Sequence, residues 1–490
     1  MRILIKFAPE IFIKSRAVRL FFVKKLIKNI KIIFRRNNEL ILIIRYWDYL
    51  EVKFKDDNIL QVSKLLMNIP GIHHFLLVRD NIISTLEDIY HCIVTANYKV
   101  RLLGKRFCIR VKRRGNHVFN SREIECYLGD KLRRNINYTY VDLTKPDEII
   151  RLEIKDNRLF IIINRYEGLG GLPIGTQRES ISLISGGFDS VVASYMLIRR
   201  GCKVHYCFFN LVGSTDVIEV YKIVYYLWNQ FSSSHKVKFI FIDFVEVINE
   251  IFSKIKSSQL LGIILKRMMM QAASSIAVLW NIRALITGEA LGQVSTQTLD
   301  NLVLIDNIVS SSCVVLRPLI AYDKEVIISL ARKIGTEIFS KKIPEYCGLI
   351  SKKSVVKVKK EYIELEESHF NYSILDNAIS QAHIIDVCSI MQYLDKQQDI
   401  FEIKTETQLC STDVLLDIRT ESEQENNPLS IPGDIKIRKI PFYKLIDQFP
   451  KLDQDKIYLL YCKHGTMSKL QAIHLYQEGF RNVKIYRISE

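Results

Sequence analysis

The chain of 490 residues lacks three features that would each assign it to a broad class of protein. Its ten cysteines include no Cys-x-x-Cys pair, which removes the usual support for a zinc ribbon or a cysteine-ligated iron–sulfur cluster. The longest uncharged, mainly apolar stretch, Met268 to Trp280, has 13 residues, whereas a membrane span needs about 18 to 20. The start, MRILIKFAPEIFIKS, carries charges among its apolar residues and has no small-residue cleavage site, so it predicts no signal peptide. We therefore expect a cytoplasmic protein with no membrane partner, in which 268–280 is a buried helix.

Positive charge is concentrated in the first third of the chain. Residues 1–175 hold 33 Lys and Arg against 18 Asp and Glu, a balance of +15, whereas the remaining residues hold 37 against 35, a balance of +2. A polyanion that docks on the first third would explain this asymmetry, and a solvated basic face without a partner is the alternative.

The length predicts roughly three or four domains. Residues 1–60 are expected to form a strand, a helix and two strands, and 61–166 a second α+β unit. From residue 181 onward apolar strands alternate with helices, which predicts an α/β doubly wound parallel sheet over 176–390. The same alternation returns over 405–490 and predicts a second, smaller α/β domain.

A basic turn follows a predicted strand in FCIRVKRRGNHVFNS, residues 107–121. It brings together positive charges and hydrogen-bond donors, and RNA phosphates are bound by both. An exposed strand end is the alternative for any one of these residues. The candidate RNA-binding residues are Lys112, Arg113, Arg114, Asn116 and His117.

A glycine-rich stretch, LISGGFDS at 183–190, lies between an apolar strand and a predicted helix. Such a turn offers backbone N–H groups, hydroxyls and a helix N-terminus to a phosphate. No lysine follows the glycines, unlike the loops that hold β- and γ-phosphates for phosphoryl transfer. The residues therefore favour pyrophosphate as a leaving group, which means attack on the α-phosphorus of ATP. Asp189 would repel the phosphate unless it contacts Mg²⁺ or orients the hydroxyls.

The motif S-G-G-x-D-S at 185–190 resembles the signature of the PP-loop ATP pyrophosphatases. Four further stretches narrow the family, namely RRGCKVHYCFFN, ILKRMMMQAA, TGEALGQVSTQT and PEYCGLISKK. With VKRRGNH near the front, the chain resembles, nearly end to end, the bacterial tRNA sulfurtransferases that make 4-thiouridine and also serve thiamine synthesis. The resemblance implies a ferredoxin-like domain at 1–60, a THUMP RNA-binding domain at 61–166, a PP-loop domain at 176–390 and a rhodanese domain at 405–490.

The resemblance also implies which residues bind ATP. Phe208 and Phe209 would lie beside adenine, although strand aromatics are more often core residues, and Lys266 would reach the phosphates, unless it only marks a surface boundary. Asp189 is implied as a catalytic residue. The remaining ATP-binding residues are Leu183, Ile184, Ser185, Gly186, Gly187, Ser190, Gly288 and Gln297.

A cysteine follows another predicted strand, in YCKHGTMS at 461–468. Backbone N–H groups and a helix N-terminus would stabilise a thiolate or persulfide on Cys462, with added positive charge from Lys463 and His464. A buried structural cysteine is the alternative. Met467 stands where many thiosulfate-processing rhodaneses carry arginine, which argues against thiosulfate as donor and is compatible with a protein persulfide. The resemblance assigns Cys347 the role of a resolving thiol that forms a disulfide with Cys462.

The reaction implied by the resemblance is adenylation of a tRNA uridine, at position 8, on O4, followed by replacement of that oxygen with persulfide sulfur. ATP and Mg²⁺ are the implied cofactors, and no iron–sulfur cluster is expected. The implied partners are tRNA, a cysteine desulfurase as donor, the sulfur-carrier protein of thiazole synthesis as a second acceptor, and a second copy of the chain in a homodimer. A PP-loop amidotransferase, a non-catalytic tRNA-binding protein and a stand-alone rhodanese are the alternatives.

Overall fold

The computed structural model describes most of the chain as two compact units, one of residues 1–176 with 199–201 and one of 177–198 with 202–490. Residues outside the description are 56–57, 212–214, 342, 344–356, 393–404, 408, 410–412, 420–423, 426–427, 430, 432–434, 463–467, 469–470, 473–474, 477 and 488–490.

The first unit begins with the elements that the sequence predicts, a strand, a helix and two further strands. They are β1 (Arg2–Phe7), the short α1 (Pro9–Phe12), α2 (Arg16–Arg36), β2 (Leu42–Arg45) and β3 (Tyr49–Lys53). Strand β3 pairs antiparallel with β1 on one edge and with β2 on the other. The buried face of α2 packs on this sheet through apolar residues such as Leu26 and Ile30, while its Lys and Arg residues are mostly exposed.

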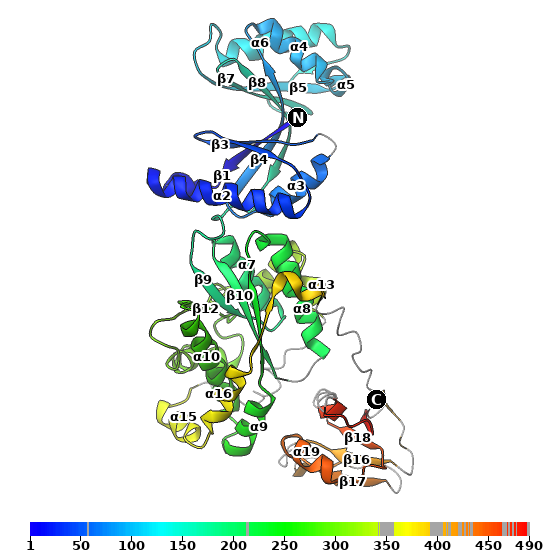
Figure 1. Cartoon of the computed structure of the whole chain (residues 1–490). Helices are drawn as coiled ribbons and strands as arrows, with labels where there is room; N and C mark the ends of the chain where they lie inside the picture. Colours follow the sequence, from blue (N-terminus) through cyan, green and yellow to red (C-terminus); the bar gives the residue numbers. More distant parts are fainter. Residues whose placement is uncertain are drawn as a thin grey trace. The chain divides into compact units, whose positions relative to one another are not determined.

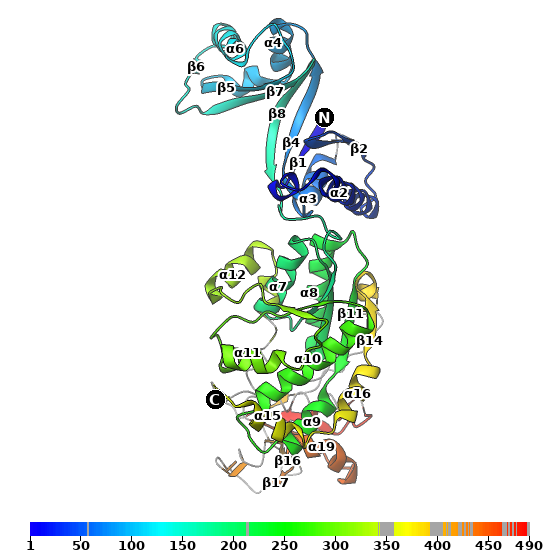
Figure 2. The ribbon, with the colours of Figure 1, turned by 90° about the vertical axis from the view of Figure 1, so that its left-hand side faces the viewer.

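The rest of the first unit extends the same sheet. Its elements are α3 (Ile59–Met67), β4 (Ile72–Ile82), α4 (Leu86–Thr95), α5 (Tyr98–Leu102), β5 (Arg106–Arg114), α6 (Ser121–Asn135), β6 (Tyr140–Val141), β7 (Glu148–Lys155) and β8 (Arg158–Glu167). The eight strands follow the order β2-β3-β1-β4-β8-β7-β5-β6. The long strands β4 and β8 lie at the centre of this order, β4 next to β1 and β8 next to β7 (Figure 2).

The border expected at residues 60 and 61 does not separate two cores. It lies at the beginning of α3, and Val62 and Leu66 of this helix pack in the same cluster as Leu26 and Ile30 of α2. A second cluster gathers residues of α4, α6 and β7, including Ile89, Leu128 and Leu152. The first core therefore extends beyond residue 60, because β4 supplies side chains such as Phe75 to it.

The second unit contains the predicted doubly wound sheet (Figure 1). Its strands follow the order β13-β12-β9-β10-β11-β14, and all neighbours are parallel except that β14 pairs antiparallel with β11. The strands are β9 (Glu179–Leu183), β10 (Lys203–Asn210), β11 (Lys238–Asp243), β12 (Ala284–Ile286), β13 (Val314–Leu316) and β14 (His383–Asp386). The helices are α7 (Phe188–Arg199), α8 (Thr215–Leu227), α9 (Val245–Lys254), α10 (Leu261–Leu279), α11 (Leu299–Asp306), α12 (Lys324–Lys333), α13 (Glu337–Ser340), α15 (Lys360–Glu367) and α16 (Tyr372–Ser380).

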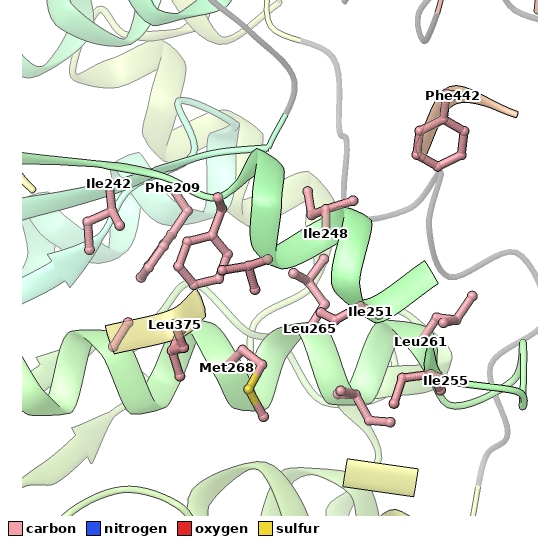
Figure 3. Packing of buried hydrophobic residues seen from close by; sticks show 14 of the residues in the cluster. Phe209, Ile242, Ile248, Ile251, Ile255, Leu261, Leu265, Met268, Leu375 and Phe442 are labelled. Carbon is pink, nitrogen blue, oxygen red and sulfur yellow. The ribbon is translucent and has the colours of Figure 1, made fainter. Parts of the chain in front are cut away.

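Helix α10 contains the apolar stretch that the sequence predicts to be buried. Among the described residues it is the one helix that is long and apolar enough to cross a membrane, yet 72% of that window is buried inside the protein. Figure 3 shows Met268 and Leu265 of α10 packed with Phe209, Ile242 and neighbouring apolar side chains. A core helix meets the same test of length and composition, and α10 packs as one.

The last part of the chain forms a separate five-stranded parallel sheet, as its alternating pattern predicts. The strands follow the order β15-β19-β18-β16-β17, and Leu415 and Leu459 are fully buried at its centre. The elements are β15 (Thr405–Glu406), β16 (Val414–Asp417), β17 (Lys436–Lys439), α19 (Phe442–Gln448), β18 (Tyr458–Tyr461) and β19 (Val483–Tyr486).

Candidate active site

The phosphate loop, defined as residues 184–190, comprises the turn after β9 and the first residues of α7, and it lies where the strand order of the sheet reverses. From β9 the chain continues to β10 and β11 on one side and returns to β12 and β13 on the other. Ligands of open α/β sheets bind beyond the carboxyl ends of the strands at such a switch point. The glycine-rich turn that the sequence singles out therefore occupies the position where this fold binds its ligand.

Two serine hydroxyls hold the phosphate loop in shape. The Ser185 N–H donates to Ser190 Oγ over 3.2 Å, and the two hydroxyl oxygens lie 3.1 Å apart. Ser190 Oγ also contacts the Gly187 carbonyl oxygen at 3.2 Å. Gly186 has a φ of +83°, and a Cβ there would lie 2.3 Å from Ile343 Cδ1, so this turn requires glycine.

Asp189 is not an unpaired negative charge in the loop. Lys324 Nζ at the beginning of α12 lies 2.8 Å from Asp189 Oδ1 and 3.0 Å from Oδ2, and Gln293 Nε2 donates to Oδ2 over 2.9 Å. Lys324 therefore offsets the repulsion that the sequence predicts between Asp189 and a phosphate. Sequence reasoning missed Lys324 and Gln293, because no local motif links residues more than 100 positions apart.

Gly288 lies directly against the phosphate loop. A Cβ at Gly288 would fall 2.5 Å from the carbonyl carbon of Asp189 and 2.6 Å from the Ser190 nitrogen. The neighbouring Glu289 accepts from Lys266 Nζ over 3.0 Å. The structure thus brings Asp189, Ser190 and Gly288 into one place, with Lys266 held by the residue that follows Gly288.

The remaining predicted nucleotide contacts are buried or partly buried. Phe208 and Phe209 are adjacent on β10 and therefore face opposite sides of the sheet. The Phe209 ring lies 4.7 Å from that of Phe244 in the core that Figure 3 shows, and the Phe208 ring lies 6.1 Å from that of Phe241. Both are packed as core aromatics, and a contact of either with adenine stays a prediction. Gln297 is buried, and its Oε1 has no hydrogen-bond partner within the described part of the chain.

Leu183 and Ile184, at the beginning of the loop, pack their apolar side chains into the protein interior. Leu183 ends β9 and packs partly buried against the main core, while Ile184 is buried and its N–H donates to the Cys207 carbonyl oxygen over 2.9 Å. Their main-chain atoms thus fix where the loop leaves the sheet.

Cys462 occupies the corresponding place in the smaller sheet, directly after β18. It is 8% exposed, and the Ser468 N–H donates to its Sγ over 3.3 Å. Beside it, the buried Asp417 accepts from Arg419 over 2.8 and 2.6 Å, and the Arg419 guanidinium lies 5.3 Å from the Tyr461 ring centroid. The predicted roles of Cys347, Lys463, His464 and Met467 concern residues outside the described ranges.

The candidate RNA-binding residues gather at the turn between β5 and α6. Arg113 Nη1 donates to the Gly115 carbonyl oxygen over 3.1 Å and lies 2.9 Å from His117 Nδ1, and the other nitrogen of His117 contacts the Asp156 carbonyl. Arg113 and His117 therefore close the turn. The other three, Lys112, Arg114 and Asn116, are exposed.

Comparisons with known families cover nearly the whole chain. Residues 2–75 match the ThiI ferredoxin-like domain, 84–164 the THUMP domain, 175–372 the thiamine biosynthesis protein (ThiI) and 402–489 the rhodanese-like domain. The predicted fold classes are thereby confirmed.

Individual relatives agree with these families. The tRNA sulfurtransferase of Blochmanniella pennsylvanica is 60% identical over 99% of both chains. That of Yersinia pestis (strain Pestoides F) is 51% identical over 99% of this chain and all of its own. A crystal structure of a 4-thiouridine synthetase–RNA complex with bound ATP is similar with a TM-score of 0.68 and 25% identity, covering 79% of this chain and 99% of that one. With its phosphate loop, Cys462 and basic turn in the positions described, the chain belongs to the tRNA sulfurtransferase family of enzymes.

Proposed function

We propose that this sulfurtransferase uses ATP to activate O4 of a uridine in tRNA and replaces that oxygen with sulfur carried on Cys462. The observation that carries the proposal is the phosphate loop, a glycine-containing turn held by the Ser185 and Ser190 hydroxyls at the beginning of helix α7, at the switch point of the sheet. The loop lacks a lysine of its own, and its one carboxylate is paired with Lys324. Such a loop suits an anion that departs as pyrophosphate.

The chemistry needs activation because the oxygen on C4 of uracil is a poor leaving group. O4 attacks the α-phosphorus of ATP, pyrophosphate departs toward the loop, and O4 becomes part of a good leaving group, AMP. The terminal sulfur of a Cys462 persulfide then attacks C4 and displaces AMP. A second thiol, Cys347, attacks the Cys462 sulfur and releases 4-thiouridine, and the resulting Cys347–Cys462 disulfide needs a cellular reductant before the next turnover.

ATP fits the residues present, and Mg²⁺ would come with it. The described residues contain no group of three His, Cys, Asp or Glu side chains that could hold a metal ion, and Asp189 is the single carboxylate of the loop. Mg²⁺ is commonly held by one or two carboxylates together with the phosphates of its nucleotide, where it offsets their negative charge. Asp189 is the residue of this loop that would hold it.

Partners follow from the same chemistry. The crystal structure of the related 4-thiouridine synthetase contains RNA and ATP, which supports tRNA and ATP here. A cysteine desulfurase would load the persulfide. The match to the thiamine biosynthesis family supports a sulfur-carrier protein as a second acceptor, since adenylation would activate its C-terminal carboxylate in the same way. Association of two copies of the chain stays a prediction.

The test is a single-turnover reaction of the persulfide-loaded chain with ATP and transcript tRNA. We expect AMP, pyrophosphate and 4-thiouridine in equal amounts, and a Cys347–Cys462 peptide in a map made without reductant. A non-catalytic RNA-binding protein would form no AMP, and a stand-alone rhodanese would transfer sulfur without ATP. Incorporation of ammonia instead of sulfur would indicate an amidotransferase.

A further inference from the structure

We propose that Glu289 is a positioning residue for nucleotide binding, which aims the ammonium group of Lys266 at the phosphates of ATP. The inference rests on the proposed function, because it takes the ligand of the phosphate loop to be ATP. Glu289 follows Gly288, whose backbone lies against Asp189 and Ser190 of the loop. It thus links the loop to Lys266 on α10, which is distant in sequence.

Glu289 uses both of its carboxylate oxygens. Lys266 Nζ lies 3.0 Å from Oε1, while Oε2 accepts from Arg317 Nε over 2.7 Å and from the Thr287 hydroxyl over 3.2 Å. Arg317 in turn donates to both carboxylate oxygens of Asp306 over 2.8 and 2.6 Å. Two cations and two carboxylates therefore alternate in one chain of contacts from α10 to α11.

The charged side chains in this chain of contacts are mostly buried. The side chains of Lys266, Glu289 and Arg317 are 16%, 11% and 12% exposed. Burial by itself would raise the pKa of the Glu289 carboxyl, but Lys266 and Arg317 outweigh it and hold that pKa below its ordinary value. Removing one partner from such a group leaves another buried charge without compensation, which costs far more than losing an exposed pair.

The arrangement leaves Lys266 able to bind an anion. A lysine ammonium has three N–H donors on a flexible four-carbon stem. One donor engages Glu289 Oε1, which fixes the position of the nitrogen, and two remain for phosphate oxygens. Without Glu289 the stem would regain its freedom and the ammonium would have to be ordered again by each nucleotide.

The experiment is a double-mutant cycle on equilibrium ATP binding by the full chain. Glu289→Gln should raise the Kd for ATP about tenfold. In a Lys266→Met background the same change should have almost no further effect, because the residue through which Glu289 acts is gone. Binding of adenosine, which has no phosphates, should be unchanged in all four proteins.

Glu337→Gln is the matched control. Glu337 also forms ion pairs with two cations, Arg332 at 3.0 Å and Lys341 at 3.1 Å. It lies on α13, however, and neither of its partners is Lys266. We expect its Kd for ATP to equal that of the natural chain. If Glu289→Gln fails to fold, Asp306→Asn at the outer end of the contacts should still weaken ATP binding about threefold.

Three results would overturn the inference: an unchanged Kd for ATP, equal weakening of ATP and adenosine, or an equal effect of Glu289→Gln with and without Lys266. These results differ from a failure of the proposed function. A chain that binds ATP but forms no AMP with tRNA would remove the proposed reaction, while the binding cycle would still decide the role of Glu289.

Discussion

The phosphate loop and Cys462 occupy corresponding places in two different sheets. Each comes directly after a central parallel strand, β9 or β18. Under the proposed function the phosphate loop would receive an anion from outside, and Lys324 pairs with its one carboxylate. At Cys462 the proposed anion would belong to the protein itself, and the Ser468 N–H donates to the Cys462 sulfur.

The two places also depend on different parts of the chain. The phosphate loop depends on contacts with distant parts of the chain, Gly288, Gln293 and Lys324, so a change far away in sequence can disable it. The sulfur of Cys462 instead accepts a hydrogen bond from the N–H of Ser468, only six positions later in the chain. The two sites should therefore be separable by mutation.

The largest separation is expected for Cys462→Ser. Loss of the sulfur nucleophile should lower 4-thiouridine formation by about 1000-fold or more, as for other deleted nucleophiles, while AMP release stays near the natural rate. Nucleoside mass spectrometry measures the first and labelled ATP the second. If AMP release fell to the same extent, the two sites would not be independent.

Asp189→Ala should produce the reverse pattern. Without the carboxylate, Lys324 Nζ and Gln293 Nε2 lose their partner at the loop, and a displaced loop should slow AMP formation roughly 100-fold. Persulfide formation on Cys462 and tRNA affinity should remain. Glu337→Gln again serves as control, and AMP release at the natural rate in Asp189→Ala would contradict the assignment of the loop.

Gly288→Ala tests the long-range contact from the other side. A Cβ 2.5 Å from the Asp189 carbonyl carbon must displace the loop, at a cost of about 1 to 3 kcal/mol, and we expect ATP binding to weaken about tenfold or more. Gly129→Ala is the matched control, because Gly129 on α6 likewise has no positive φ and its added Cβ would meet only Val141 Cγ2, at an ordinary contact distance of 3.7 Å. Equal ATP affinities of the two variants would show that Gly288 is not close to the nucleotide.

A third strand–turn–helix, the basic turn between β5 and α6, differs from the phosphate loop because exposed Lys and Arg side chains supply its positive charge. Lys112→Ala with Arg114→Ala should weaken tRNA binding about tenfold and reduce the slope of log K against log salt by about 1.4 to 1.8, since two phosphate contacts are lost. Arg113→Ala should mainly lower thermal stability, because Arg113 bonds the turn itself. A larger loss of slope for Arg113→Ala would reverse these roles.

The smallest effect is expected for Ser468→Ala. The main-chain N–H that contacts Cys462 Sγ is kept, and the lost group is a buried hydroxyl that has no hydrogen-bond partner in the described ranges. We expect persulfide formation to slow about threefold at most, measured with a persulfide donor under pseudo-first-order conditions. A loss as large as that of Cys462→Ser would make the hydroxyl part of the reacting group.

Local patterns were enough to predict the strand and helix on either side of the phosphate loop and the strand that precedes Cys462. The phosphate loop combines a strand, a turn and a helix start within a few consecutive residues, so the prediction of a phosphate site there rests on neighbouring residues alone. Phe208 and Phe209 are adjacent on β10 and face opposite sides of the sheet, and their predicted place beside adenine stays a prediction. Only the structure shows that residues 59–67 form a helix, α3, whose Val62 and Leu66 pack in the first core, so the predicted border at residue 60 falls within it.

The sequence by itself determined the order of the fold classes and the family, because both depend on motifs of neighbouring residues, and its assignment of the reacting groups stays a prediction. Only the tertiary structure decided that Lys324 pairs with Asp189 and that Glu289 holds Lys266. These contacts arise because β12 lies beside β9 in the sheet. In the sequence, by contrast, Gly288 and Gln293 come 99 and 104 residues after Asp189 of the loop. Burial then makes the charges pair, since a buried charge without a partner is too costly to keep.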